Sequence, residues 1–286
     1  MYGAIIGDIV GSIYEFDNIK TKDFPLFSSD CEFTDDTVMT VAVARALMES
    51  LEAQKPCIPL FTAQMQEMGL DWPGRGYGCR FLRWLWEREP HPYTSLGNGS
   101  AMRASPCGLI AVSLEEALAL AEASAVVTHN HPEGIKGAQA TAAAVYLAKN
   151  GSSRAEIRDF IQSNFYPLEQ TLDEIRPGYV FNETCQETVP QAIQAFLESE
   201  SFEDALRCAI SLGGDSDTLA AITCSIAGAF YHPWGQALPS DMALIQAQAD
   251  TFLPRQFRDT IRDFEQLCLR RREAFKREGR CAPIPL

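Results

Sequence analysis

Apolar residues recur along this chain at spacings of three and four, and short segments rich in glycine, proline and polar residues separate the apolar stretches. This spacing is typical of helices, and no stretch shows convincingly the strict alternation of a half-buried strand. We therefore predict an all-α fold, a single compact domain over residues 1–286 with orthogonally packed helices and no internal repeat. The predicted helices span residues 1–12, 38–54, 57–68, 81–89, 114–127, 135–149, 153–164, 168–175, 189–199, 202–212, 219–231, 239–252 and 254–277.

The first predicted helix carries glycine at every fourth position. Gly3, Gly7 and Gly11 share one face, and this spacing lets another backbone approach closely. Tight helix packing in the core explains that face. The segments between the helices are expected to be loops, including residues 17–33, 68–80, 91–106 and 128–134, with a turn at Trp234–Gly235, and residues 151–205 carry no motif that we identify.

Composition limits the class of protein. The 286 residues are 46% apolar and 22% charged, which is a globular composition with enough material for a core. A net charge of −14 argues against a nucleic-acid surface or an anionic membrane as partner, so nucleic acid is expected only as a modified substrate. Nine cysteines without CxxC spacing indicate buried or free thiols in a reducing cytoplasm. Neither a signal peptide nor a membrane span is expected.

One acidic cluster lies directly before the apolar run of residues 219–231. The cluster reads Gly213-Gly214-Asp215-Ser216-Asp217-Thr218, a tight turn into a buried helix for which Ser216 or Asp217 is the expected N-cap. Two carboxylates at the start of a buried helix are costly unless a positive charge meets them. The helix macrodipole supplies only about half an elementary charge. A metal ion is the better candidate.

A second acidic cluster, Thr34-Asp35-Asp36-Thr37, also precedes an apolar helix, with Thr34 as its natural N-cap. Helix capping alone is the usual explanation for an isolated Thr-Asp-Asp. Together the two clusters offer four carboxylates and threonine hydroxyls with no Cys or His, a set that suits Mg²⁺ or Mn²⁺ rather than Zn²⁺. Four carboxylate charges would balance two divalent ions. We therefore predict a dinuclear metal cleft.

Weaker signals lie in the glycine-rich loops. Residues 74–78 read Gly-Arg-Gly-Tyr-Gly, which suits either a surface turn or a backbone that approaches a ligand. Residues 97–103 read Gly-Asn-Gly-Ser-Ala-Met-Arg and suit phosphate oxygens, although they form no Walker A loop. His129 and His131 favour hydrogen bonding over zinc binding, because no third soft ligand is near. Glu15 lies between two aromatic residues, ahead of an irregular loop.

Six motifs in this order resemble the ADP-ribosylglycohydrolase family. They are Gly7-Asp8-Ile9-Val10-Gly11-Ser12-Ile13-Tyr14-Glu15, the two acidic clusters, residues 74–78, residues 97–103 and Thr128-His129. The resemblance implies an all-helical fold with two Mg²⁺ or Mn²⁺ ions. It implies as metal ligands Thr34, Asp35, Asp36, Asp215, Asp217 and Thr218. It implies a mobile acid at Glu15 and, as residues of an ADP-ribose groove, Gly76, Tyr77, Gly78, Asn98, Gly99, Ser100, Met102 and His129.

The function that the resemblance implies is hydrolysis at the ribose anomeric carbon of an ADP-ribosylated substrate, with ADP-ribose as product. Asp35 or a neighbouring carboxylate would help to deprotonate the attacking water, and a carboxylate-rich cleft would stabilise a cationic sugar. A metal-dependent nucleotide phosphohydrolase and a non-catalytic ADP-ribose-binding protein are the alternatives. We expect a cytoplasmic monomer, and the sequence does not define the leaving group.

Overall fold

The computed structural model describes residues 1–232 and 238–286, so the turn expected at Trp234–Gly235 lies outside the described residues. The described residues form helices with one isolated antiparallel bridge, Gly97 to Thr184, and no strand, which confirms the all-α prediction. The first elements are α1 (Tyr2–Gly11), η1 (Ser12–Tyr14), α2 (Asp35–Ala53), α3 (Cys57–Asp71), α4 (Cys79–Leu85), α5 (Gly99–Met102), α6 (Ser105–Ile110) and α7 (Leu114–Val126). The later ones are α8 (Pro132–Lys149), α9 (Arg154–Asn164), α10 (Leu172–Ile175), α11 (Cys185–Leu197), α12 (Phe202–Ile210), α13 (Ser216–Tyr231), α14 (Ser240–Ala249), η2 (Asp250–Phe252) and α15 (Arg255–Glu278).

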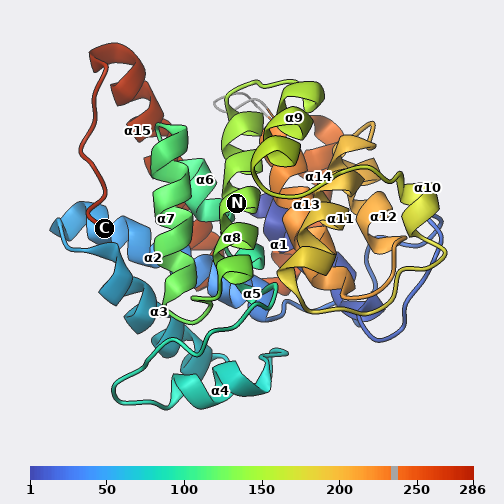
Figure 1. Cartoon of the computed structure of the whole chain (residues 1–286), viewed down its shortest axis with the longest axis horizontal. Coiled ribbons are helices and arrows are strands. Elements are labelled where there is room, and N and C mark those ends of the chain that lie inside the picture. Colours follow the sequence, from blue (N-terminus) through green and yellow to red (C-terminus); the bar gives the residue numbers. More distant parts are fainter. Residues whose placement is uncertain (233–237) are drawn as a thin grey trace.

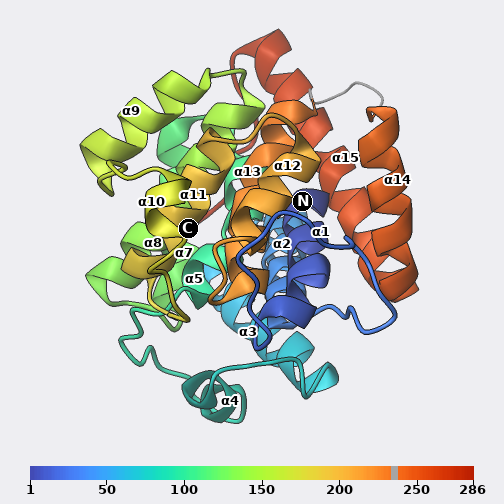
Figure 2. The same ribbon diagram turned by 90° about the vertical axis from the view of Figure 1, so that its right-hand side faces the viewer.

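Helices α1 and α13 lie side by side at the centre of the molecule (Figures 1 and 2), and Figure 2 shows α9, α10 and α11 on one side of them and α14 and α15 on the other. A Cβ atom added at Gly3, Gly7 or Gly11 would lie 2.0, 2.2 or 2.5 Å from the α13 backbone. The glycine face of α1 therefore packs against another backbone, as its spacing predicts. This contact sets how closely the start of α13 approaches the end of α1.

The Gly7→Ala variant is expected to unfold at a lower temperature, with a loss of about 3 kcal/mol, because the new methyl group would meet the carbonyl of Ala220. Thermal and urea unfolding would measure the loss. The matched control is Gly178→Ala, since a Cβ there meets no atom within 4 Å. Equal stabilities for the two variants would contradict the close packing of α1 on α13.

Several helix ends differ from the sequence prediction. The segment predicted as a loop at residues 91–106 contains α5 and the start of α6, which are too short for an apolar period to reveal. The expected N-cap of α13 was wrong: Asp215 is the cap residue, because Gly213 and Gly214 adopt φ values of 69° and 83° and complete the turn before it. A glycine pair suits this turn, since other residues rarely adopt positive φ.

The predicted capping residue of α2 is confirmed. The Thr34 side chain accepts a hydrogen bond from the backbone N–H of Asp36 at 3.3 Å. Helix α8 begins three residues before its predicted start, and His131 caps it by accepting from the N–H of Glu133 at 3.1 Å. The role of His131 in the fold is therefore hydrogen bonding.

A contiguous apolar core joins α1, α2, α8, α11 and α13. All nine cysteines are free, and most of them are buried in this core, as the sequence predicts. Among residues 1–232 and 238–286, no helix combines the length and apolar character needed to span a membrane. Helix α4 projects at one end of the molecule (Figures 1 and 2), and Cys79, Arg80 and Leu82 of its first turn are exposed.

Candidate active site

The two acidic clusters meet at the N-termini of α2 and α13. Thr218, in the first turn of α13, donates its hydroxyl hydrogen bond to Asp36 Oδ2 at 3.0 Å, although the two residues are 182 positions apart in the chain. Helix N-termini attract negative charge through their free N–H groups and their dipole. Two such N-termini therefore gather four aspartates in one place, as the sequence analysis expects from the chemistry of the clusters.

Asp8, for which no site role was predicted, fixes the turn before α2. This carboxylate is fully buried and accepts hydrogen bonds from the Thr34 N–H at 2.9 Å, the Thr34 hydroxyl at 2.7 Å and the Thr37 N–H at 3.0 Å. Helix α1 therefore holds the first cluster as well as the start of α13. The sequence signal for this role is a lone acid inside an apolar helix, where an unpaired buried charge is costly.

A cleft of about 620 Å³ opens above the acidic clusters. Its walls include most of the predicted site residues, namely Glu15, Asp35, Asp36, Gly76, Tyr77, Gly78, Asn98, Gly99, Met102, His129, Asp215, Asp217 and Thr218. Thr34 and Ser100 are not among the lining residues: Thr34 is occupied with Asp8, and Ser100 donates to the Gly134 carbonyl at 2.7 Å. Lining residues that the sequence analysis did not assign include Phe16, Arg80, Tyr93, Phe181 and Glu183.

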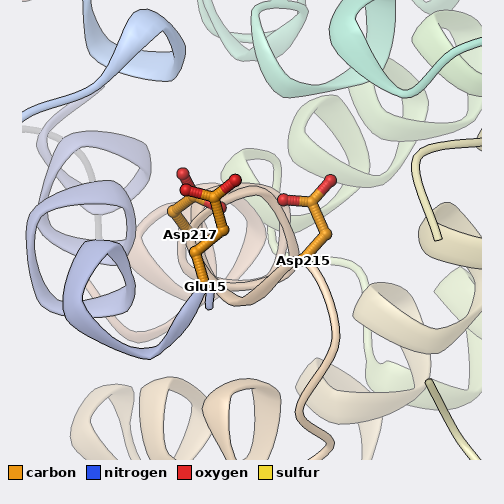
Figure 3. Close-up of side chains that lie close together, drawn as sticks. All are labelled: Glu15, Asp215 and Asp217. Atoms are coloured by element: carbon orange, nitrogen blue, oxygen red, sulfur yellow. The ribbon is translucent and has the colours of Figure 1, made fainter. Parts of the chain in front are cut away.

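Three carboxylates lie closest together. One oxygen from each of Glu15, Asp215 and Asp217 lies within 4.8 Å of the other two. Figure 3 shows Asp215 and Asp217 at the start of α13 and the Glu15 side chain, which follows η1, pointing into the same space. This spacing allows one cation to touch all three groups.

The electrostatics of the cleft favour a bound cation. Burial, reinforced by the negative charge of Asp217, raises the pKa of Asp35 and Asp36 well above its ordinary value. Burial also raises the pKa of Asp217 well above its usual range, that of Asp215 to about 6 and that of Glu15 to about 8. Among the residues that the structure describes, no lysine, arginine or histidine forms an ion pair with these acids.

The donor atoms fit a hard divalent ion. Asp36 Oδ1 is buried and has no hydrogen-bond partner, so one strong acceptor is left free. A buried acceptor of this kind is costly unless a ligand satisfies it. The neighbouring polar atoms are oxygens of carboxylates and of the Thr218 hydroxyl, which are the ligand types that Mg²⁺ and Mn²⁺ prefer.

Divalent ions are expected to raise the melting temperature, and to raise it more at about pH 8 than at about pH 5.5. In the folded protein without metal, the pKa values of Asp215 and Glu15 are raised from 3.8 and 4.5 to about 6 and about 8. A carboxyl group whose pKa is raised by folding stabilises the folded protein at pH values below its unfolded pKa. This stabilisation is lost as the pH rises through the folded pKa. Burial of the charged carboxylates and the repulsion between them cause this loss, and a bound cation offsets both.

Differential scanning fluorimetry with millimolar MgCl₂ or MnCl₂ would measure the gain, with NaCl of equal ionic strength as the control. A gain that is the same at both pH values, or absent at the higher one, would contradict a preformed cation site.

The Gly74–Gly78 loop forms one wall of the cleft. The carbonyl of Arg75 accepts a hydrogen bond from the Asp35 N–H at 2.7 Å, which ties the loop to the first turn of α2. Gly76 has a φ of 92°, and a Cβ added there would lie 3.2 Å from Asp35 Oδ1. The backbone of this loop therefore passes directly beside the acidic end, where a side chain would crowd the carboxylate.

The Gly97–Gly99 turn forms another part of the cleft wall. Asn98 donates from its backbone to the Glu183 carbonyl at 2.7 Å and from its side chain to Asp215 Oδ2 at 2.6 Å. Behind the turn, His129 Nδ1 hydrogen-bonds with the Thr128 hydroxyl at 2.7 Å, and a Cβ at Gly99 would lie 3.3 Å from His129 Nε2. Burial, with the charge of Arg103 and Arg80, lowers the pKa of His129 well below 6.5, so its ring is neutral.

Comparison with known proteins agrees with this geometry. The family model described as ADP-ribosylglycohydrolase matches residues 1–276. The chain is 29% identical to the ADP-ribosylhydrolase ARH3 of Bos taurus over 311 residues, covering 80% of this chain and 83% of the relative. It is 27% identical to the ADP-ribosylarginine hydrolase Tri1 of Serratia proteamaculans (strain 568) over 267 residues, covering 81% and 70%.

The fold also matches a solved structure. The chain superimposes on an ADP-ribosylglycohydrolase-related protein complex with a TM-score of 0.66 at 24% identity, covering 95% of this chain and 94% of the other. That likeness supports the helical architecture alone. The family model is a match of the sequence itself over nearly its whole length, including both acidic clusters. The chain belongs to the ADP-ribosylglycohydrolase family.

Proposed function

We propose that this protein is a metal-dependent hydrolase that removes ADP-ribose from an ADP-ribosylated protein or small molecule by cleaving the bond at the ribose anomeric carbon. The observation that carries this proposal is the gathering of Glu15 and four aspartates at one end of a cleft with glycine-rich walls. The transition state of such a cleavage is cationic at the sugar, and fixed carboxylates stabilise it.

The proposed metal ligands are Thr34, Asp35, Asp36, Asp215, Asp217 and Thr218, which would hold two Mg²⁺ or two Mn²⁺ ions. Unpartnered Asp36 Oδ1 and the raised pKa values of the aspartates support this set. When bound, such ions supply positive charge that orients the ribose hydroxyls and lowers the pKa of a water.

The chain itself would move the proton and hold the substrate. Asp35 lies beside the Gly76 backbone at the cleft wall and is proposed to accept the proton of the attacking water. Glu15 is proposed to stabilise the developing positive charge of the sugar. The residues proposed to form the ADP-ribose groove are Gly76, Tyr77, Gly78, Asn98, Gly99, Ser100, Met102 and His129, of which Ser100 lies behind the lining and donates to the Gly134 carbonyl.

A panel of defined substrates tests the function. It contains ADP-ribosyl-arginine, ADP-ribosyl-serine, an ADP-ribosylated nucleic-acid end and a small ADP-ribosylated metabolite, each with Mg²⁺ and with Mn²⁺. The relative named an ADP-ribosylarginine hydrolase is the reason to try the arginine substrate first. Free ADP-ribose is the expected product. Release of phosphate instead would favour the nucleotide phosphohydrolase, and no release from any substrate would favour a non-catalytic ADP-ribose-binding protein.

We also propose that the protein acts as a cytoplasmic monomer formed by one domain. Free thiols suit a reducing compartment, and a contiguous core suits one domain. Light scattering of the purified protein would test the monomer directly.

A further inference from the structure

Positive charge is scarce around the cleft. The lining contains Glu15, four aspartates and Glu183, and the whole chain carries a net charge of −14. An ADP-ribosyl group carries two negative charges on its diphosphate, so such a ligand would be repelled unless a cation meets it. The basic side chains that line the cleft are Arg80, Arg103 and His129.

Two of these three cannot supply the charge. Arg103 is 1% exposed, and its guanidinium donates to the Ser124 carbonyl at 3.0 Å and the Thr128 hydroxyl at 2.8 Å. Arg103 therefore supports the cleft wall from inside the protein, and its charge is not presented to a ligand. His129 is buried, bonded to the same Thr128 hydroxyl, and neutral.

Arg80 differs from both, because it is exposed in the first turn of α4. Its guanidinium lies over the Tyr93 ring, 4.7 Å from the centroid, and donates through Nη2 to the Tyr93 carbonyl. Within the described part of the chain, no carboxylate forms an ion pair with it. The stacked ring fixes the direction of the group and leaves its charge for a ligand.

A series of contacts places Arg80 away from the carboxylates. Asn98 bonds to Asp215 at the acidic end, and Gly99 follows it beside His129. The ring of His129 lies 6.0 Å from that of Tyr93, on which Arg80 rests. The Gly97–Gly99 turn therefore lies between the aspartates and Arg80, so a ligand with its ribose at the aspartates can place its diphosphate over this turn and beside Arg80.

We propose that Arg80 binds the diphosphate of the ADP-ribosyl substrate and makes the cleft selective for phosphate-bearing ligands. This inference rests on the proposed function. Arginine suits the task, because its planar fork pairs with two phosphate oxygens at once. The site residues implied by the family resemblance do not include Arg80.

The test is titration calorimetry of the Mg²⁺-loaded protein with ADP-ribose at several NaCl concentrations. The Arg80→Met variant keeps the stem and loses the charge, so its Kd for ADP-ribose is expected to rise about 10- to 100-fold. Its Kd should also depend less on salt, since one exposed charge contact is gone. In turnover, KM should rise by a similar factor while kcat changes little.

Two further variants separate charge from packing. Arg80→Lys should recover the salt dependence and part of the affinity. Arg83→Met is the control, because Arg83 is exposed on the same helix and does not line the cleft. An unchanged Kd in Arg80→Met would overturn the proposal. A higher Kd with an unchanged salt dependence would also overturn the proposal, because Arg80 would then only support Tyr93.

Failure of this inference is distinguishable from failure of the proposed function. Tight ADP-ribose binding by the wild-type protein without turnover of any substrate would refute the hydrolase, while the comparison of variants would still decide the role of Arg80. A wild-type protein that does not bind ADP-ribose would refute both.

Discussion

The Asp217→Ala variant is expected to lose at least one bound metal ion and to fall in kcat by about 10³-fold or more. Asp217 is buried in the first turn of α13, and its carboxylate shares a space with those of Glu15 and Asp215. Asp215 is held at the N-terminus of α13, and Glu15 already occupies its own place beside the two aspartates, so neither can replace the lost carboxylate. Asp215→Ala should behave alike.

Elemental analysis of the purified protein, beside a turnover assay, measures both effects. The matched control is Asp241→Ala, which removes an exposed aspartate from the first turn of α14. Chelation of the wild-type protein should abolish turnover, and added Mg²⁺ or Mn²⁺ should restore it. Full metal occupancy in Asp217→Ala would contradict the assignment of this carboxylate as a ligand.

The Glu15→Gln variant is expected to lose about 10²-fold or more in kcat, with a much smaller change in ADP-ribose affinity. The amide keeps the shape of the side chain and removes its charge. Glu15 is half-buried, and burial with the nearby charges of Asp217 and Asp8 raises its pKa to about 8. A carboxylate held among other acids in this way is suited to bind a positive group, either a metal ion or the cationic sugar.

Turnover and calorimetric titration with ADP-ribose separate these two effects. Asp23→Asn is the control, because Asp23 is an exposed acid of the loop that follows Glu15 and does not line the cleft. Near wild-type turnover in Glu15→Gln would remove Glu15 from the catalytic group and leave the aspartate clusters alone in that role. A loss of ADP-ribose affinity equal to the loss of turnover would indicate binding rather than catalysis.

The sequence predicted the helices and the acidic end of the cleft because both follow from local patterns. Apolar spacing identifies long helices, and oxygen ligands at two helix starts indicate a hard metal. Thr34 illustrates this, since its capping geometry is local to its own turn. The predicted N-cap of α13 was wrong, because the choice among neighbouring polar residues depends on the φ values of Gly213 and Gly214. Composition does not specify these angles.

The rest of the site depends on contacts between distant segments. Asp8 accepts a hydrogen bond from a turn that lies 26 residues later in the chain. Glu183 lies at the cleft because its carbonyl accepts a hydrogen bond from the Asn98 N–H. Arg80 differs from any exposed helical arginine only through its position over Tyr93. Residues 151–205 showed no motif, yet this segment supplies Phe181 and Glu183 to the lining. Such roles depend on tertiary placement, so single-sequence patterns do not reveal them.

The packing of α1 on α13 also has a consequence for biosynthesis. The ribosome makes α1 before α2 to α12, and the helix that covers its glycine face and supplies Asp217 follows only after all of these. A nascent chain that ends before α13 holds Asp35 and Asp36 without their partners, because Thr218 follows Asp36 by 182 residues. Contacts this distant form late. Metal uptake is therefore expected to follow translation, and metal content would report the fraction of chains that have finished folding.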